Sequence, residues 1–158
     1  MKKIMSLALA GAMASTFALA KEIKIGAIMP MSGPIAAYGQ VTNLGINLAN
    51  KLQPTLKNGD TIKIVLLDNK GDKVETANAT TRLISSDKVV AILGALTSTN
   101  TAQVIAIADK KKVPVIASVA TNDKLTSRRT YANRVCFTDS FQGEVVANYA
   151  KEQGYKTA

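Results

Sequence analysis

Apolar segments recur along the chain after Lys21, and each has the length and composition of a β-strand. Near-continuous runs rich in valine and isoleucine are typical of strands that are covered on both faces, as in a parallel sheet. The pattern therefore predicts buried strands in five places, namely residues 23–29, 62–67, 89–93, 113–117 and 133–137.

The segments between these strands carry helix-start signals and apolar residues at helical spacing. Asp72 and Glu75 form a capping box, after which Val74, Ala77 and Ile84 share one face of the predicted helix. That face is expected to point to the sheet.

Three further helices are predicted in the same way. One runs from Tyr38 to Leu52 and ends before a proline, which cannot continue it comfortably. Asp139 and Gln142 repeat the capping box for another. In the third, Ser98 is the expected cap. Its inward stripe is Thr101, Val104, Ile105 and Ala108.

Strands that alternate with helices through short connections predict an α/β fold with a doubly wound parallel sheet. In such sheets the ligand crevice lies beyond the carboxyl ends of the strands. The segments expected to carry a binding site are 30–39, 68–72, 95–99 and 118–125. They are rich in serine, threonine, glycine and asparagine.

The first 20 residues read as a signal peptide: Lys2 and Lys3 precede an apolar run, and Ala18-Leu19-Ala20 offers a cleavage site. A membrane anchor is the alternative. Residues 4–20 would reach only about 25 Å as a helix, short of a hydrocarbon core of roughly 30 Å. Cleavage after Ala20 and a soluble protein in the periplasm are therefore expected.

Composition after cleavage argues against a nucleic-acid partner. Without Lys2 and Lys3, the 20 Lys and Arg residues fall to 18 against 11 Asp and Glu, so the net charge is about +7. The basic residues are dispersed, and the sequence has no tryptophan. A nucleic-acid surface combines clustered basic residues with stacking aromatics, and that combination is missing here.

The sequence also lacks the parts of common catalytic sites. It has no histidine, no G-x-S-x-G elbow, no metal-ligand spacing and no G-x-G-x-x-G fingerprint, so no enzyme, metal or cofactor is predicted. Its one cysteine, Cys136, cannot form an intramolecular disulfide. Val135 and Phe137 on either side predict that Cys136 is a small hydrophobe in a buried strand, not a reactive thiol.

The segment Leu96-Thr97-Ser98-Thr99 leads into a predicted helix and offers neutral hydrogen-bonding groups. Its hydroxyls and free N–H groups could hold a carboxylate at the positive end of the helix without an arginine. The alternative is that Ser98 only caps its own helix. Spacing alone leaves both interpretations open.

Several motifs in one order give residues 21–158 a resemblance to a known family. They resemble the first part of a periplasmic substrate-binding protein of the branched-chain amino acid ABC-transporter family, the leucine/isoleucine/valine-binding type. The motifs are IKIGAIMPMSGPIAAYG at 23–39, LLDN at 66–69, ILGALTS at 92–98, VPVIASVAT at 113–121 and DSFQG at 139–143.

The resemblance implies a type I periplasmic-binding fold and a set of ligand contacts. It makes Ser98 the carboxylate-binding hydroxyl, the Val119 carbonyl and the Thr121 hydroxyl the ammonium contacts, and Tyr38 an aromatic wall for the ligand side chain. Leu96 and Thr97 belong to the same strand-end segment as Ser98. For Tyr38 the alternative is an exposed aromatic at a helix start.

The resemblance also implies domain organisation and partners. Residues 21–138 form a first lobe and 139–158 begin a second lobe, which is largely missing. The chain is therefore expected to be a truncated or split product with exposed apolar surface. The ligand is expected to be a branched-chain or related amino acid, delivered by a monomer to a membrane permease.

Other functions remain open at this point. A binder of an amide, urea or another small polar solute has the same fold, because most of the side-chain pocket would lie in the second lobe. A non-functional fragment is a further alternative. So are an α/β enzyme and a sensory module that reuses the fold. Where some family members carry a disulfide, Gly71 and Thr97 stand in this sequence.

Overall fold

The structure is a computed structural model that describes residues 20–157, so the predicted signal peptide lies outside the described residues except for Ala20. Strands and helices alternate along the described chain, and the boundaries lie within a few residues of those predicted. The elements are β1 (Glu22–Met29), α1 (Ala36–Leu52), β2 (Thr61–Asp68), α2 (Lys73–Ser85), β3 (Ala91–Gly94), α3 (Ser98–Ala108), a 3-10 turn (Asp109–Lys111), β4 (Val115–Ala117), β5 (Ala132–Arg134) and α4 (Asp139–Glu152).

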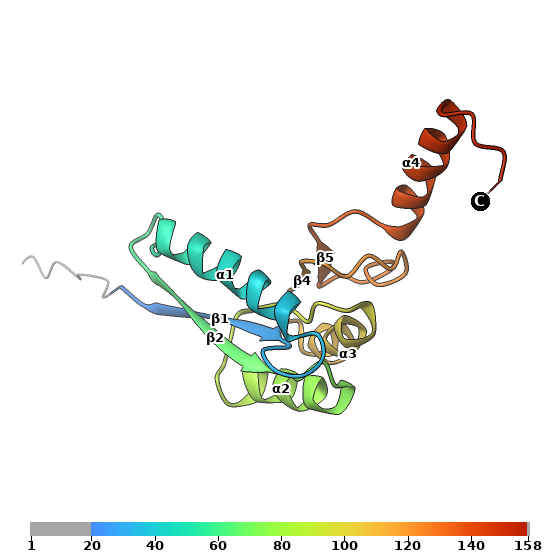
Figure 1. The fold of residues 1–158 in the computed structure, drawn as a ribbon. Coiled ribbons are helices and arrows are strands. Elements are labelled where there is room, and N and C mark those ends of the chain that lie inside the picture. Colours follow the sequence, from blue (N-terminus) through green and yellow to red (C-terminus); the bar gives the residue numbers. More distant parts are fainter. Residues whose placement is uncertain (1–19, 158) are drawn as a thin grey trace, which may run out of the picture.

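The strands form a parallel sheet in the order β2-β1-β3-β4-β5. The longest pairing joins β1 to β2, from Glu22 opposite Thr61 to Met29 opposite Asp68. Helix α1 covers one face of the sheet, whereas α2 and α3 cover the other (Figure 1). The prediction of a doubly wound α/β fold is therefore confirmed.

The core lies between the sheet and the layer formed by α2 and α3. Ile28, Ile92 and Val115 from three strands are fully buried, together with Leu83 from α2 and Val104 from α3. Full burial of such side chains contributes about 1.5–3 kcal/mol each. The inward stripe predicted for α3 is confirmed. Its members Thr101, Val104, Ile105 and Ala108 are all buried.

The face predicted for α2 is wrong at Val74, whereas Ile84, also predicted to face inward, is partly buried and packs against the core. Val74 is 66% exposed, and the buried residues of this helix are Thr76, Ala79, Thr80 and Leu83. Threonine can face the core here because its hydroxyl bonds the carbonyl one turn earlier, as Thr80 does to Thr76 at 2.7 Å. Its methyl group is then free to pack. The predicted cap, Asp72, does accept N–H groups of the first turn.

The fifth strand is shorter than predicted, and its last part is not buried. β5 ends at Arg134 because its partner β4 supplies a ladder only to Ala117. Beyond it Val135 and Phe137 are 74% and 53% exposed. The prediction that Cys136 lies in a buried strand is therefore wrong. Its thiol is half-buried outside the sheet and donates to the Ala120 carbonyl at 3.3 Å.

Helix α4 extends away from the sheet (Figure 1), and none of its residues is buried. Thr138 caps it by accepting the Phe141 N–H, so the cap is one residue before the predicted Asp139. Its large apolar residues are exposed, as are Val41, Leu44, Leu48 and Leu52 on α1. The exposed apolar surface predicted from the sequence is present in this part of the chain.

No helix within residues 20–157 combines the length and the apolar character needed to cross a membrane.

Candidate ligand-binding site

The candidate site lies where the strand order reverses. From β1 the chain turns to β2 through α1 on one face, whereas from β3 it turns to β4 through α3 on the opposite face. The loops after β1 and β3 therefore diverge and leave a crevice at the carboxyl ends of these strands.

A concavity of about 270 Å³ occupies this position. The structure brings together all six residues predicted from the sequence, and two more that were not named individually. Ile35 comes from the loop before α1, and Ala120 lies between two predicted residues on the loop after β4. The complete lining is Ile35, Tyr38, Leu96, Thr97, Ser98, Val119, Ala120 and Thr121.

Polar groups at the start of α3 face this concavity. Thr97, not Ser98, caps the helix, because the Thr97 hydroxyl accepts the Asn100 N–H at 3.3 Å. The interpretation of Ser98 as a cap is thus wrong. The Ser98 hydroxyl oxygen instead accepts the Asn122 N–H at 3.3 Å, which leaves its proton available to donate. The first N–H groups of α3 have no acceptor within the helix.

Leu96 shapes the same wall through an unusual backbone conformation. Its φ is +77°, in the left-handed region that side chains with a Cβ rarely adopt. The residue is nevertheless buried. Strain of this kind, about 1–3 kcal/mol, is concentrated at binding sites and persists only where surrounding contacts impose it.

The loop after β4 forms the opposite wall. Val119 is 43% exposed and Thr121 is half-buried. The Thr121 carbonyl accepts the N–H of Asp139 at 3.0 Å, so the backbone at this position is tied to the first turn of α4. The loop thus links the concavity to the helix that leaves the sheet.

Tyr38 borders two concavities. It is 69% exposed and lines the first together with a neighbouring apolar hollow of about 340 Å³. Leu96 and Val119 are also shared, and Val41 extends the second hollow along α1. An aromatic ring at this place offers a large apolar surface beside the polar groups of α3.

A larger apolar groove, of about 590 Å³, lies farther along α1 against the sheet. Ile46 of the helix and Ile62, Ile64 and Leu93 of the sheet contribute to it. It includes the Ser118 hydroxyl, but not the start of α3 or the Thr121 hydroxyl that converge in the smaller concavity. The smaller one is the better candidate for a specific ligand.

Asp68 is a supporting residue whose full role the sequence did not reveal. Its carboxylate accepts the Lys70 N–H at 2.8 Å and so stabilises the turn at the end of β2. Its carboxylate also accepts from the Met31 N–H at 2.9 Å and from the Ser32 hydroxyl at 2.5 Å. It therefore holds the loop that leads into α1 and Tyr38. Asp68 lies beside this loop because β2 pairs with β1, and the sequence alone does not reveal that pairing.

The electrostatics of Asp68 match this anchoring role. Burial raises the pKa of its carboxyl, but the hydrogen bonds from the Ser32 hydroxyl and from backbone N–H groups outweigh burial and hold the pKa below its ordinary value. The carboxylate is therefore charged at neutral pH and remains a strong acceptor.

Asp123 makes a similar contact between the loop after β4 and α4. Its carboxylate accepts the Ser140 hydroxyl and, at 3.3 Å, the Ser140 N–H. These bonds, the hydroxyl first, hold the pKa of Asp123 below its ordinary value despite the opposing effect of burial.

The Asp123 contact is expected to depend on pH. Because the pKa is lower in the folded state, the contact contributes fully above the unfolded value of about 3.9 and is lost as pH falls through the folded value. The protection of the Ser140 amide from hydrogen exchange, relative to its intrinsic exchange rate at each pH, should fall in acid. Asp123→Asn should remove this pH dependence. The same acid response in both proteins would contradict the assignment.

Among residues 20–157, no group of three or more His, Cys, Asp and Glu side chains is arranged to hold a metal ion. The concavity is lined by hydroxyls, backbone groups and apolar side chains. The arrangement is that of a doubly wound α/β lobe with a concavity at the carboxyl ends of its strands.

The comparisons with known proteins name the family. A family model described as periplasmic binding protein matches residues 22–158, and the chain belongs to this family. A Leu/Ile/Val-binding protein from Rhizobium johnstonii is 31% identical over 81% of the chain and 35% of the relative. The chain spans less than two fifths of that relative's length.

Solved structures agree on the fold. The branched-chain amino acid transporter substrate-binding protein LivJ of Streptococcus pneumoniae, in complex with isoleucine, is 40% identical with a TM-score of 0.78, over 84% of this chain and 38% of that one. A solute-binding protein of an ABC transporter from Rhodopseudomonas palustris, in complex with 3,4-dihydroxybenzoic acid, is 28% identical with a TM-score of 0.81, over 85% and 37%. Both similar proteins bind small carboxylic acids.

Proposed function

We propose that this chain contributes one lobe to an extracytoplasmic solute-binding component of an ABC importer, and that the solute is a branched-chain or related amino acid. The observation that carries the proposal is the convergence of the α3 start, two loop residues and an aromatic side chain on one concavity. A zwitterion with an apolar side chain needs donors, acceptors and an apolar wall in this arrangement.

Each end of the proposed ligand has a partner. Its carboxylate accepts from the Ser98 hydroxyl and from the first N–H groups of α3, where the helix dipole also favours negative charge. Its ammonium donates to the Val119 carbonyl and the Thr121 hydroxyl. Its side chain lies against Tyr38, beside Leu96 and Thr97. Ile35 and Ala120 complete the wall.

An aromatic carboxylate is a second candidate, favoured by the similarity to the protein that binds 3,4-dihydroxybenzoic acid. The α3 start would serve either carboxylate. The difference lies at Val119 and Thr121, because an aromatic acid has no ammonium group to donate to them. The contacts at Val119 and Thr121 therefore distinguish an amino acid from an aromatic carboxylate.

The wider role follows from the family. We propose export to the periplasm through residues 1–20, a first lobe over residues 21–138 and the start of a second lobe over 139–158. The protein acts as a monomer that captures solute between two lobes and delivers it to a membrane permease, without catalysis and without a cofactor. Hinge closure of two lobes is how such proteins retain ligand.

Nuclear magnetic resonance titration of the isotope-labelled chain tests the proposal, since it detects weak binding to one lobe. Leucine, isoleucine and valine should shift the amide signals of Ser98, Thr99 and Thr121. L-Leucinamide, which lacks the carboxylate, should shift them much less. If 3,4-dihydroxybenzoate shifts Ser98 and Thr99 while the amino acids do not, the second candidate replaces the first. Absence of shifts at α3 with every ligand would reject both.

A further inference from the structure

Arg134, the last residue of β5, donates to several groups on the loop after β4, residues 118–126, here called the pocket loop. Its guanidinium bonds the carbonyl oxygens of Ala120 at 3.3 Å, Asn122 at 2.8 Å and Asp123 at 3.3 Å. It also reaches the Thr126 hydroxyl at 3.2 Å. The planar fork of arginine suits this task, because it presents several donors in fixed directions.

One of these bonds continues to the binding site. Asn122 accepts from Arg134 through its carbonyl and donates its N–H to the Ser98 hydroxyl oxygen at 3.3 Å. With that oxygen already accepting, the Ser98 proton remains available to donate, and Ser98 lines the concavity. Arg134 therefore contacts the pocket wall indirectly, through Asn122.

We propose that Arg134 is a positioning residue of the ligand site: it holds the pocket loop so that Val119 and Thr121 face the concavity and Asn122 orients the Ser98 hydroxyl. The proposal rests on the proposed function for its effect on ligand affinity. Arg134 itself does not line the concavity. Its guanidinium donates to loop carbonyls and is not a proposed ligand contact.

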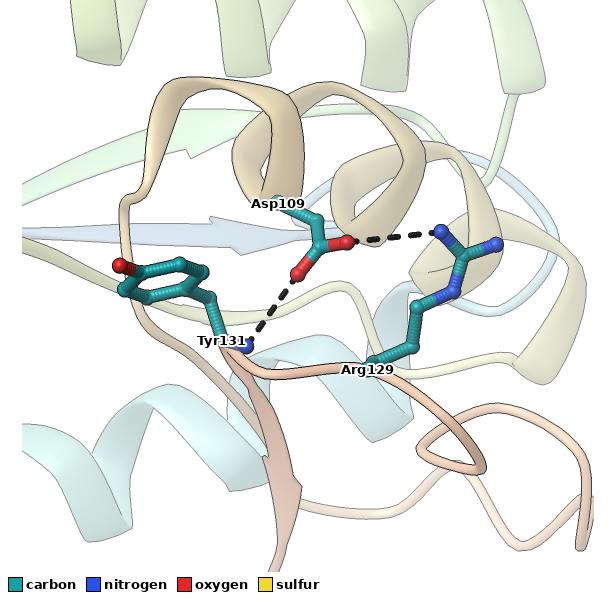
Figure 2. A network of polar contacts seen from close by, with 3 residues as sticks. All are labelled: Asp109, Arg129 and Tyr131. Carbon is teal, nitrogen blue, oxygen red and sulfur yellow. Dashed lines mark hydrogen bonds and ion pairs between the residues drawn. The ribbon is translucent and has the colours of Figure 1, made fainter.

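The other end of the connection from β4 to β5 provides a matched control. Figure 2 shows Asp109 accepting the Tyr131 N–H at 3.2 Å and pairing with the Arg129 guanidinium at 3.5 Å. Asp109 follows the last residue of α3, and the 11 residues of that helix place it about 16 Å from Ser98. Arg129 thus offers the same side chain on the same connection, far from the concavity.

The test compares Arg134→Gln, Arg134→Lys and Arg129→Gln by hydrogen exchange, thermal unfolding and titration with leucine. Arg134→Gln should accelerate exchange of the pocket-loop amides about tenfold and weaken leucine binding about tenfold, with little change in the unfolding midpoint. Arg134→Lys should restore part of both, because an ammonium reaches some of the carbonyls. Arg129→Gln should change neither quantity at the pocket.

Pocket-loop exchange unchanged in Arg134→Gln would overturn the proposal. So would faster exchange with unaltered leucine affinity, or an equal effect of Arg129→Gln. If Arg134→Gln does not fold, Arg134→Lys carries the comparison. If the unmodified chain does not bind leucine at all, the proposed function fails, and exchange at the Asn122 amide still decides whether Arg134 holds the loop.

Discussion

The Gly39→Ala variant is expected to lose about 3 kcal/mol of unfolding free energy, because α1 passes directly over the backbone of Pro30. A Cβ at position 39 would lie 2.1 Å from the Pro30 carbonyl oxygen and 2.7 Å from its carbonyl carbon. Neither atom belongs to a flexible side chain. The helix would have to move, and its shift would carry Tyr38 away from Ser98.

Gly45→Ala is the matched control for this effect. It lies in the same helix, and a Cβ there would meet nothing within 4 Å. Alanine is better than glycine in a helix interior by roughly 0.5–1 kcal/mol, so this variant should be slightly more stable than the original chain.

Urea unfolding followed by circular dichroism measures both changes on the same helix. The two variants are expected to shift the midpoint in opposite directions. Gly39→Ala should also reduce any leucine-dependent shift at Ser98. A Gly39→Ala protein as stable as Gly45→Ala would show that α1 does not need this close approach.

The fold could be predicted because its signal is periodic and local. Strands β1 and β2 are long apolar runs, and the predicted and observed boundaries differ by at most one residue at each end. The short strands were harder. β3 and β4 begin two residues later than predicted, since Val89 and Val113 bond back to the preceding helices through Leu83 and Ala108. In the sequence pattern, a hydrophobic residue in a connection cannot be distinguished from the first residue of a strand.

The site was predictable in its location but not in its supporting contacts. Carboxyl-end loops of a doubly wound sheet point to the crevice, and the resemblance supplied individual residues for it. What the sequence could not supply depends on contacts between distant segments. Asp68 lies 37 residues from Met31, whose N–H it accepts, and Asn122 lies 24 residues from Ser98. Pairings across such separations are set by strand order.

Cys136 and the caps show a second limit. A one-residue change in a helix start exchanges the roles of Thr97 and Ser98, because both are good capping residues. Likewise, apolar neighbours around Cys136 predicted burial, whereas the sheet ends two residues earlier. The hydrophobic pattern predicts whether a segment is a helix or a strand more reliably than it predicts the residue at which the segment ends.

The double variant Ser98→Ala, Thr121→Val is expected to weaken binding of leucine by about a hundredfold or more. Each hydroxyl bonds a charged end of the proposed ligand, and a hydrogen bond to a charged group contributes about 1.5–3 kcal/mol. The two residues come from different loops and contact opposite ends of the ligand, so their effects should largely add. A loss of about 3 kcal/mol corresponds to roughly a hundredfold in Kd.

The matched control is Thr81→Val with Ser85→Ala on α2, which deletes the same groups from exposed positions that do not line the concavity. Its affinity for leucine should equal that of the original chain, as should its unfolding midpoint. Titration of all three proteins with leucine, followed at the Thr99 amide, gives the comparison. Unchanged affinity in the Ser98 and Thr121 double variant would place the ligand elsewhere. An equal loss in the control would mean that the effect comes from the fold and not from the proposed contacts.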